Sequence, residues 1–175
     1  HDGSTKYVRE RCETDYDDNG EPLRSLGTIL DITEHKLAEQ ALRESGLQLR
    51  SITSAAKDAI LMADDDGKLV FWNKAAERLF GYTWAEAVGS PLSELIIPEK
   101  LREMHDKGYA AFSRSGEGAV VGKTVELSAQ RKDGSVLPVE LSVSALKLKG
   151  KWHAIGILRD ITERRQMGEQ LNKLA

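Results

Sequence analysis

Residues 59–73, with the sequence AILMADDDGKLVFWN, decide the fold of this chain. Two short apolar runs, residues 59–63 and 68–73, flank an Asp-Gly turn at residues 64–67. Apolar runs on either side of such a turn are a strong local signal for an antiparallel hairpin. The stretch therefore predicts two paired strands, and the hairpin also explains the acidic cluster better than a metal site does.

The rest of the pattern predicts helices and then three more strands. Short helical segments are expected at residues 75–80 and 84–88, and a longer helix is expected to begin at Pro98, because proline is favoured in the first turn. Turns at residues 132–135 and 149–151 join three runs in which apolar and polar residues alternate, as in half-buried strands. This order predicts an α+β fold in which helices cover one face of a five-stranded antiparallel sheet.

Three local motifs, taken in this order, resemble the PAS family. Residues 71–82 (FWNKAAERLFGY) resemble its second strand and first helix, and residues 131–140 (RKDGSVLPVE) resemble its central hairpin. Residues 159–163 (RDITE) resemble the end of the domain. The resemblance implies a PAS domain over residues 54–163, which is a sensory module rather than an enzyme.

Composition excludes several other classes of protein. The chain has 175 residues, of which 40% are apolar, and a net charge of −3. This charge gives no electrostatic reason to expect nucleic acid. No run approaches the roughly 18 apolar residues of a membrane span. Cys12 is the only cysteine, so we expect no disulfide, no metal site and a reducing, cytoplasmic location without membrane insertion.

No sequence feature indicates catalysis. Glycine-rich phosphate loops are absent, and His35 does not lie in a phospho-acceptor sequence of the histidine-kinase type. Light-sensing relatives that form a flavin adduct need a cysteine in the helical segment, whereas Cys12 lies far upstream. We therefore expect no catalytic residues in this chain.

The first residues repeat the end of the PAS-like stretch. Residues 1–4 (HDGS) match residues 132–135 (KDGS), and residues 29–34 (ILDITE) match residues 158–163 (LRDITE). The two offsets, from position 1 to 132 and from position 31 to 160, are nearly equal. A repeat at such a spacing is typical of tandem domains. Residues 1–33 are therefore interpreted as the last two strands of a truncated upstream PAS domain.

That hairpin needs a partner. A two-stranded hairpin is only marginally stable alone in water. We expect protein from the same chain or from a second copy to cover its apolar face. An independent mini-domain is the alternative interpretation.

Both copies of the repeat end in the sequence DITE, which is typical of a helix start. The aspartate can accept hydrogen bonds from exposed amides, and the glutamate three residues on can reach back. The sequence thus predicts a helical linker at residues 34–53 and the start of an output-coupling helix at residues 164–175. By analogy with the family, a signal would pass through the capping residues Asp31, Thr33, Asp160 and Thr162.

The linker carries a spacing typical of a coiled coil. Apolar or small residues recur at steps of four, three, four and three along one face, at Ala38, Leu42, Ser45, Leu49 and Ile52. Gly46 opposes this interpretation, because glycine costs about 1 kcal/mol inside a helix. The alternative is an amphipathic helix packed on its own domain. We predict a homodimer whose seam contains Ala38, Leu42, Leu49 and Ile52, together with the adjoining sheet surface.

His105 is the candidate functional side chain. It shares one face of its helix with Leu101, Gly108 and Phe112, so it is expected to point toward the sheet. In haem-binding PAS domains a histidine at the corresponding place ligates the iron, and an arginine twenty residues later steadies the bound gas. Here that later position is Val125, which cannot donate a hydrogen bond.

Other positions of the haem pattern differ as well. Lys123 occupies the place where some relatives have a second axial ligand, and Gly108 replaces an aromatic residue. The purely structural interpretation of His105 is a core histidine whose hydrogen bonds are made within the domain. For Asn73 the structural interpretation is a helix cap, and the functional one is a polar group at the mouth of the pocket. We predict a small apolar pocket, normally without haem and open to an unknown small-molecule ligand, lined by Phe71, Asn73, Leu79, Phe80, Met104, His105, Phe112, Leu127, Leu141, Ile155 and Ile157.

Two functions remain open from the sequence. The first is a cytoplasmic sensory and dimerisation module of a multidomain bacterial signalling protein, such as a sensor histidine kinase or a diguanylate cyclase. The second is a haem-binding gas or redox sensor in which His105 is the proximal iron ligand. Absorbance of bound haem would separate the two.

Overall fold

The computed structural model describes residues 5–174, and the chain divides into two compact units, His1–Arg50 and Ser51–Ala175. In the first unit, β1 (Val8–Tyr16) pairs with β2 (Pro22–Asp31) as an antiparallel hairpin. Helix α1 (Thr33–Ala55) follows β2 directly. The sequence match at residues 1–4 lies outside the described residues.

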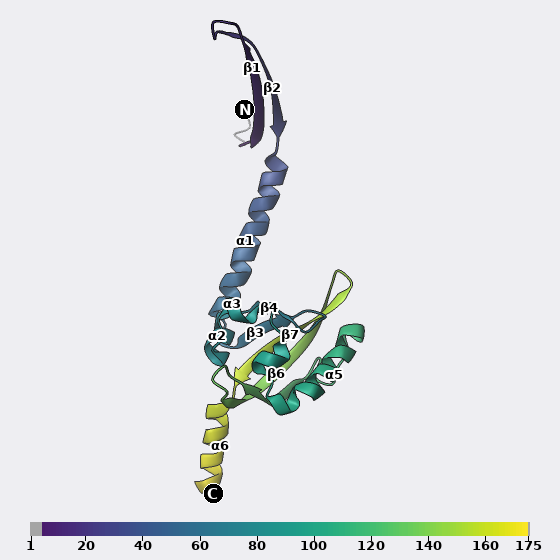
Figure 1. The fold of residues 1–175 in the computed structure, drawn as a ribbon. Coiled ribbons are helices and arrows are strands. Elements are labelled where there is room, and N and C mark those ends of the chain that lie inside the picture. Colours follow the sequence, from purple (N-terminus) through teal and green to yellow (C-terminus); the bar gives the residue numbers. More distant parts are fainter. Residues whose placement is uncertain (1–4, 175) are drawn as a thin grey trace. The chain divides into compact units, whose positions relative to one another are not determined.

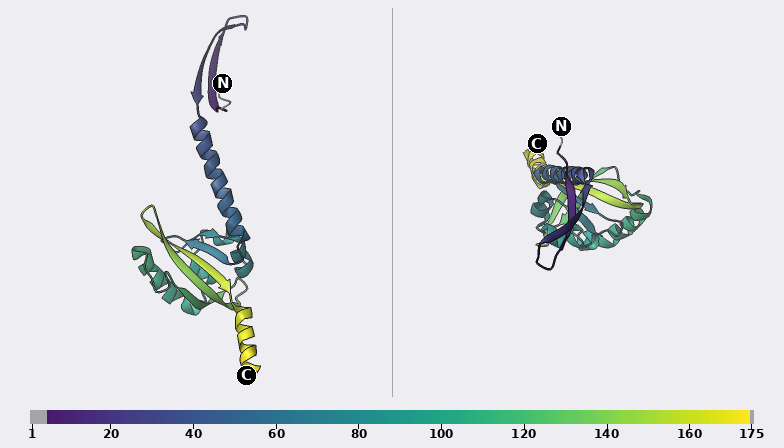
Figure 2. Two further views of the ribbon diagram at one scale, coloured as in Figure 1. Left: turned by 180° about the vertical axis from the view of Figure 1, so that it is seen from behind. Right: turned by 90° about the horizontal axis from the view of Figure 1, so that it is seen from above.

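The second unit is built on a five-stranded antiparallel sheet with the order β4-β3-β7-β6-β5. Figures 1 and 2 show the helices α2 to α5 gathered on one face of this sheet. The predicted α+β fold is therefore confirmed. Its strands are β3 (Ala59–Ala63), β4 (Leu69–Trp72), β5 (Thr124–Gln130), β6 (Val136–Leu148) and β7 (Lys151–Asp160).

The helices agree with the sequence pattern except at two places. Four of them lie between β4 and β5 along the chain: α2 (Lys74–Phe80), α3 (Trp84–Ala87), α4 (Leu92–Ile96) and α5 (Glu99–Ser115). Pro98 is the N-cap of α5, so the helix begins one position later than predicted. Helix α4 was not predicted, because so short a segment does not show a helical period. A last helix, α6 (Thr162–Leu174), leaves the sheet after β7.

The β3–β4 turn is held by an aspartate. The Asp64 carboxylate accepts hydrogen bonds from the Asp66 and Lys68 amides, at 3.0 and 2.9 Å. Gly67 has a φ of 77°, a conformation that glycine adopts without steric cost. The acidic run is thus part of the hairpin turn.

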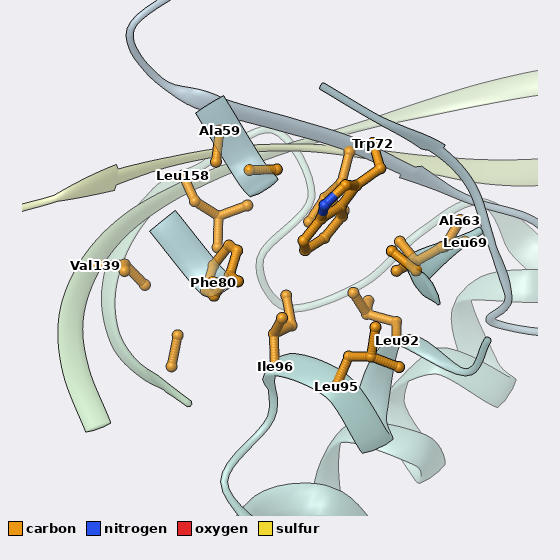
Figure 3. Packing of buried hydrophobic residues seen from close by; sticks show 14 of the residues in the cluster. Ala59, Ala63, Leu69, Trp72, Phe80, Leu92, Leu95, Ile96, Val139 and Leu158 are labelled. Atoms are coloured by element: carbon orange, nitrogen blue, oxygen red, sulfur yellow. The ribbon is translucent and has the colours of Figure 1, made fainter. Parts of the chain in front are cut away.

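The core packs between the β3–β4 hairpin and the short helices (Figure 3). Phe80 and Leu69 are fully buried, and the Phe80 ring lies 5.5 Å from the Trp72 ring. The Trp72 indole N–H donates to the Tyr82 carbonyl at 3.1 Å, so its one polar group is satisfied. Two rings and the aliphatic side chains around them therefore fill this end of the domain.

Asn73 is the one buried polar or charged residue among those described, at 4% exposure. Its Oδ1 atom accepts hydrogen bonds from the Ile60 amide at 3.0 Å and from the Ala76 amide at 2.9 Å. Its Nδ2 atom donates to the Thr53 and Asp58 carbonyls at 3.0 and 3.1 Å. One side chain thus joins the end of α1, the start of β3 and the first turn of α2.

The repeat seen in the sequence extends to the geometry of the strands. The pair Val8–Asp31 in the β1–β2 hairpin corresponds to the pair Val139–Asp160 between β6 and β7. The Ile32 amide donates to the carbonyl of Tyr7, and the Ile161 amide likewise donates to that of Pro138. The two hairpins therefore share their register as well as their final sequence.

Replacing Asn73 with alanine should destabilise the second unit by about 3 kcal/mol, because the substitution removes a helix cap and leaves buried backbone groups without partners. Urea denaturation followed by circular dichroism measures the change. The exposed neighbour Lys57→Ala is the control, and it should change the free energy of unfolding by less than about 0.5 kcal/mol. A loss for Asn73→Ala as small as that of the control would contradict this role.

Candidate functional site

A cavity of about 440 Å³ lies between α5 and the inner face of the sheet. Cavities of roughly 300–1,000 Å³ are typical of small-molecule sites. Most of its wall is apolar and comes from α4, α5, the residues before β5 and every strand of the sheet except β4. Among the lining side chains are Leu101, His105, Phe112, Leu127, Leu141 and Val143.

Helix α5 is anchored over the cavity in its C-terminal half. The Tyr109 hydroxyl donates to the Asp64 carbonyl at 2.7 Å, and burial raises the pKa of this phenol well above its usual value. Phe112 is buried beside it. The helix ends at Gly116, where φ is +74° and an added Cβ would lie 2.5 Å from the Trp152 ring. Only glycine fits this contact, which holds α5 against β7.

The N-terminal half of α5 is held by an arginine. The Arg102 guanidinium donates to the Ile97 and Glu94 carbonyls, both at 3.1 Å. It thereby satisfies carbonyls around the end of α4 that have no partner within the helix.

Met104, which follows Leu101 on this helix, is 69% exposed although it lines the cavity. This part of the helix therefore forms the mouth.

His105 lies in the cavity wall, and its side chain is 24% exposed. Its Nδ1 atom is 3.2 Å from the Asp106 carboxylate, and its ring stacks 5.8 Å from that of Tyr109. In a neutral imidazole one ring nitrogen donates a hydrogen bond, and the other can accept one or bind a metal. The predicted inward face of α5 thus places one polar ring among apolar side chains.

Two of the three residues that differ from the haem pattern, Lys123 and Val125, lie apart from this imidazole. The Lys123 ammonium donates to the Ala119 carbonyl at 3.1 Å and steadies the loop before β5. Val125 pairs with Leu141 in the sheet, and it is not among the lining residues. Neither side chain supplies a donor to the cavity.

Five of the predicted pocket residues line this cavity, namely Met104, His105, Phe112, Leu127 and Leu141. Ile155 and Ile157 do not.

For β7, the prediction was wrong about which side chains face the cavity. Leu158 pairs with Leu141 and Gly156 with Val143, so the even-numbered residues of β7 face the cavity. Successive side chains of a strand point to opposite faces, so Ile155 and Ile157 point away from it, and Ile157 is 42% exposed. The sequence could not fix this phase, because the run is apolar on both faces.

The other four predicted residues also lie elsewhere. Phe71 pairs with Met62 at a bulge, on the sheet face away from the cavity. Leu79 and Phe80 belong to the core around Trp72, and Asn73 is the helix cap. Leu79, Phe80 and Asn73 thus lie at the end of the domain around Trp72, whereas Phe71 lies on the outer face of the sheet.

Sequence reasoning missed the small residues that make the space. Ala63, Ala129, Ala154 and Gly156 all line the cavity. An added Cβ at Gly156 would come within 3.2 Å of Leu61. A glycine inside an apolar strand marks such a close approach, and this was the available signal.

The predicted relay residues form two matching helix starts. The Asp160 carboxylate accepts from the Thr162 amide at 2.8 Å and from its hydroxyl at 2.6 Å. Asp31 accepts from Thr33 in the same way, and these bonds lower the pKa of Asp31 to about 2. Both aspartates therefore accept a hydrogen bond from an amide at the helix start, as predicted, and each also accepts one from the threonine hydroxyl.

Ion pairs that the sequence did not reveal hold the start of α6 to the sheet. The Arg164 guanidinium contacts Glu126 on β5 at 2.5 Å and Glu140 on β6 at 3.1 Å. The Arg165 guanidinium contacts Glu126 at 2.6 Å. Both arginines lower the pKa of the Glu126 carboxylate, and the hydrogen bond from Arg165 has the larger effect. Arg131 also pairs with Asp160 at 3.1 Å. The first turn of α6 is thus tied to strands that line the cavity.

Helix α1 carries the predicted dimer seam. The helix runs unbroken through Gly46, and none of its residues is buried. The seam side chain Leu42 is 77% exposed, and Leu49 and Ile52 are also exposed. The apolar seam therefore remains uncovered in the single chain. No helix in residues 5–174 has the length and apolar character needed to cross a membrane.

Comparison with known proteins agrees with this architecture. A family model described as the PAS fold matches residues 47–161. Sensor protein FixL of Bradyrhizobium diazoefficiens is 31% identical over 169 residues, which is 97% of this chain and 33% of FixL. Oxygen sensor protein DosP of Escherichia coli is 27% identical, over 79% of this chain and 17% of DosP. The chain thus spans a third or less of the length of these relatives.

A solved structure agrees too. The PAS domain of an HTR-like protein from Haloarcula marismortui superposes with a TM-score of 0.57 and 25% identity, and the match covers 72% of this chain and 99% of that chain. The family model spans the strands and helices that enclose the cavity. Because this model matches most of the chain and the sheet has the expected architecture, this chain belongs to the PAS family.

Proposed function

We propose that this chain is the sensory and dimerisation module of a multidomain bacterial signalling protein, such as a sensor histidine kinase or a diguanylate cyclase. The cavity beneath α5 receives a small molecule, and α6 passes the bound state to an output domain. The chain itself takes no part in catalysis, and it works in the cytoplasm.

The cavity is the observation that carries this proposal. Its volume is about 440 Å³, and most of its wall is apolar. Protein interiors are close-packed, and voids larger than a water molecule are few. A space of this size inside a packed domain therefore indicates a site for a ligand.

The route from cavity to helix is short. Leu127 and Leu141 line the cavity from β5 and β6, while Glu126 and Glu140 on the same strands hold α6. A ligand that separates or draws together these strands therefore shifts the anchors of α6. The Asp160–Thr162 cap keeps the first turn of α6 formed while its direction changes. Strands β5 and β6 are then the physical element that couples the cavity to α6.

Removing the Asp160 cap should weaken the coupling between the cavity and α6. In Asp160→Ala, amides of the first turn of α6 should exchange with deuterium about 10-fold faster than in the wild type, since loss of a cap costs about 1 kcal/mol or more. Hydrogen exchange read by mass spectrometry measures this. Asp31→Ala is the matched control, because it removes the same cap at α1 and should leave α6 unchanged.

The same experiment tests the coupling. Adding the apolar dye N-phenyl-1-naphthylamine should change exchange in α6 of the wild type, and this response should be smaller in Asp160→Ala. A dye that binds without any change in α6 would contradict the proposed relay.

Dimerisation completes the proposed module. Ala38, Leu42, Leu49 and Ile52 are spaced for a helical seam, and burial of leucine side chains at such a seam drives association. The outer sheet face, which carries Ile155 and Ile157, extends the interface. Residues 1–33 are the last two strands of an upstream PAS domain, and the shared register of the two hairpins supports this assignment.

Leu42→Asp should convert the dimer to a monomer at tens of micromolar. A carboxylate at the seam would have to be desolvated beside its counterpart, which outweighs the association energy of one helix pair. Light scattering coupled to size exclusion measures the mass. Leu47→Asp, also an exposed leucine of α1 but off the seam, should remain a dimer. A wild-type monomer under these conditions would contradict the proposal.

Haem sensing is the second candidate, favoured by one observation: the His105 imidazole in the cavity wall. DosP is named an oxygen sensor, and the apolar wall suits a haem ring. Of the residues in the wall, His105 could form one bond to the haem iron, and haem would supply gas binding. Val125 offers no hydrogen bond to a bound gas, and polarity on that side decides gas binding.

We expect haemin not to bind stoichiometrically to the wild type. Titration with haemin, read as Soret absorbance, tests this expectation. A stoichiometric band that is lost in His105→Ala would instead establish the haem function. His153→Ala is the control, because this histidine lies on β7 outside the cavity wall.

A further inference from the structure

The wall of the cavity contains no charged partner for a ligand. Among the described residues that line it, none is a lysine, arginine, aspartate or glutamate. The Tyr109 hydroxyl already donates to the Asp64 carbonyl. Ser128 also belongs to the wall, but it lies on β5 between Leu127 and Ala129, which face the cavity, so alternation along the strand turns its hydroxyl to the other face of the sheet. The imidazole of His105 is therefore the main side-chain group in the wall that can hydrogen-bond a ligand.

This wall discriminates against charged molecules. Moving a carboxylate or phosphate out of water without a counter-charge is strongly unfavourable, whereas an apolar chain gains about 0.8 kcal/mol for each buried methylene. A ligand that enters fully must therefore be uncharged.

Gly108 gives the cavity its length along α5. A Cβ added at this position meets no atom within 4 Å, although Leu101, His105 and Phe112 on the same face all line the cavity. The lining residues of α5 run from Leu101 to Phe112. With a rise of about 1.5 Å per residue, this part of the helix is about 16 Å long. The missing side chain thus leaves open space beside the imidazole, in the middle of a long apolar wall.

We propose that the cavity takes an uncharged, elongated apolar molecule with a single hydrogen-bonding group, of which a medium-chain alcohol is the simplest form. Its polar group meets His105, and its chain passes over Gly108. Gly108 is then a specificity-determining position. The inference rests on the proposed function of this cavity as the sensory site.

Displacement of N-phenyl-1-naphthylamine, whose fluorescence rises in apolar sites, tests the ligand class. At pH 8, where a carboxylic acid is ionised, 1-decanol should displace the dye from the wild type at a concentration at least tenfold lower than decanoate. In His105→Leu, displacement by 1-decanol should need about fivefold more alcohol, the usual effect of one lost hydrogen bond.

Substitutions at two glycines test whether Gly108 determines what the cavity can hold. Gly108→Leu should lower dye affinity at least tenfold, because the new side chain occupies the open space. Gly46→Leu is the matched control, a helical glycine of α1 that also has nothing within 4 Å, and it should bind the dye like the wild type. Circular dichroism and the melting temperature confirm that both variants fold. Undiminished dye binding in Gly108→Leu would overturn the role of Gly108.

The outcomes separate this inference from the proposed function. If decanoate displaces the dye as well as 1-decanol does, while Gly108→Leu still blocks binding, the uncharged class is wrong and the sensory cavity stands. If the wild type binds neither the dye nor the alcohol, the cavity is not a ligand site and the proposed function fails with the inference.

Discussion

The second unit depends on the four hydrogen bonds of Asn73. This side chain is buried between the end of α1, the first residues of β3 and the start of α2, and both of its polar atoms are used twice. A buried amide that keeps all its partners specifies one arrangement of the segments around it, since any other arrangement leaves polar groups unpaired. Asn73 thereby sets where the last turn of α1 meets the first strand of the sheet.

The division between core and cavity follows from side-chain size. Around Trp72 and Phe80 the interior is filled by these two rings and by aliphatic side chains such as Leu69, Leu95 and Ile96 (Figure 3). Toward β5 and β7 the inward positions include Ala129, Ala154 and Gly156, which carry at most a methyl group. The Tyr109 hydrogen bond and the close contact of Gly116 with β7 hold that helix in place, so the sheet and helix cannot close the gap. The space exists because small residues face a fixed helix.

The same strands carry two kinds of contact on opposite faces. Leu127 and Leu141 face the cavity, while Glu126 and Glu140 hold Arg164 of α6. Alternation of side chains along a strand makes this possible, because neighbours point to opposite sides. The domain thus places its cavity wall and the anchors of its outgoing helix on one pair of strands, with only the thickness of the sheet between them.

Sequence alone determined the fold, while only the tertiary structure decided which residues meet at the cavity. The Asp-Gly hairpin, the alternating strands and the capping aspartates are local signals, and each acts within a few residues. The inward face of α5 around His105 likewise follows from helical periodicity. The phase of Ile155 and Ile157, by contrast, depends on their pairing with β6, because their run is apolar on both faces. The contacts of Arg164 and Arg165 with Glu126 join distant positions that no local pattern encodes. A cavity is not predictable from a local pattern either, because it arises where distant segments bring small side chains face to face.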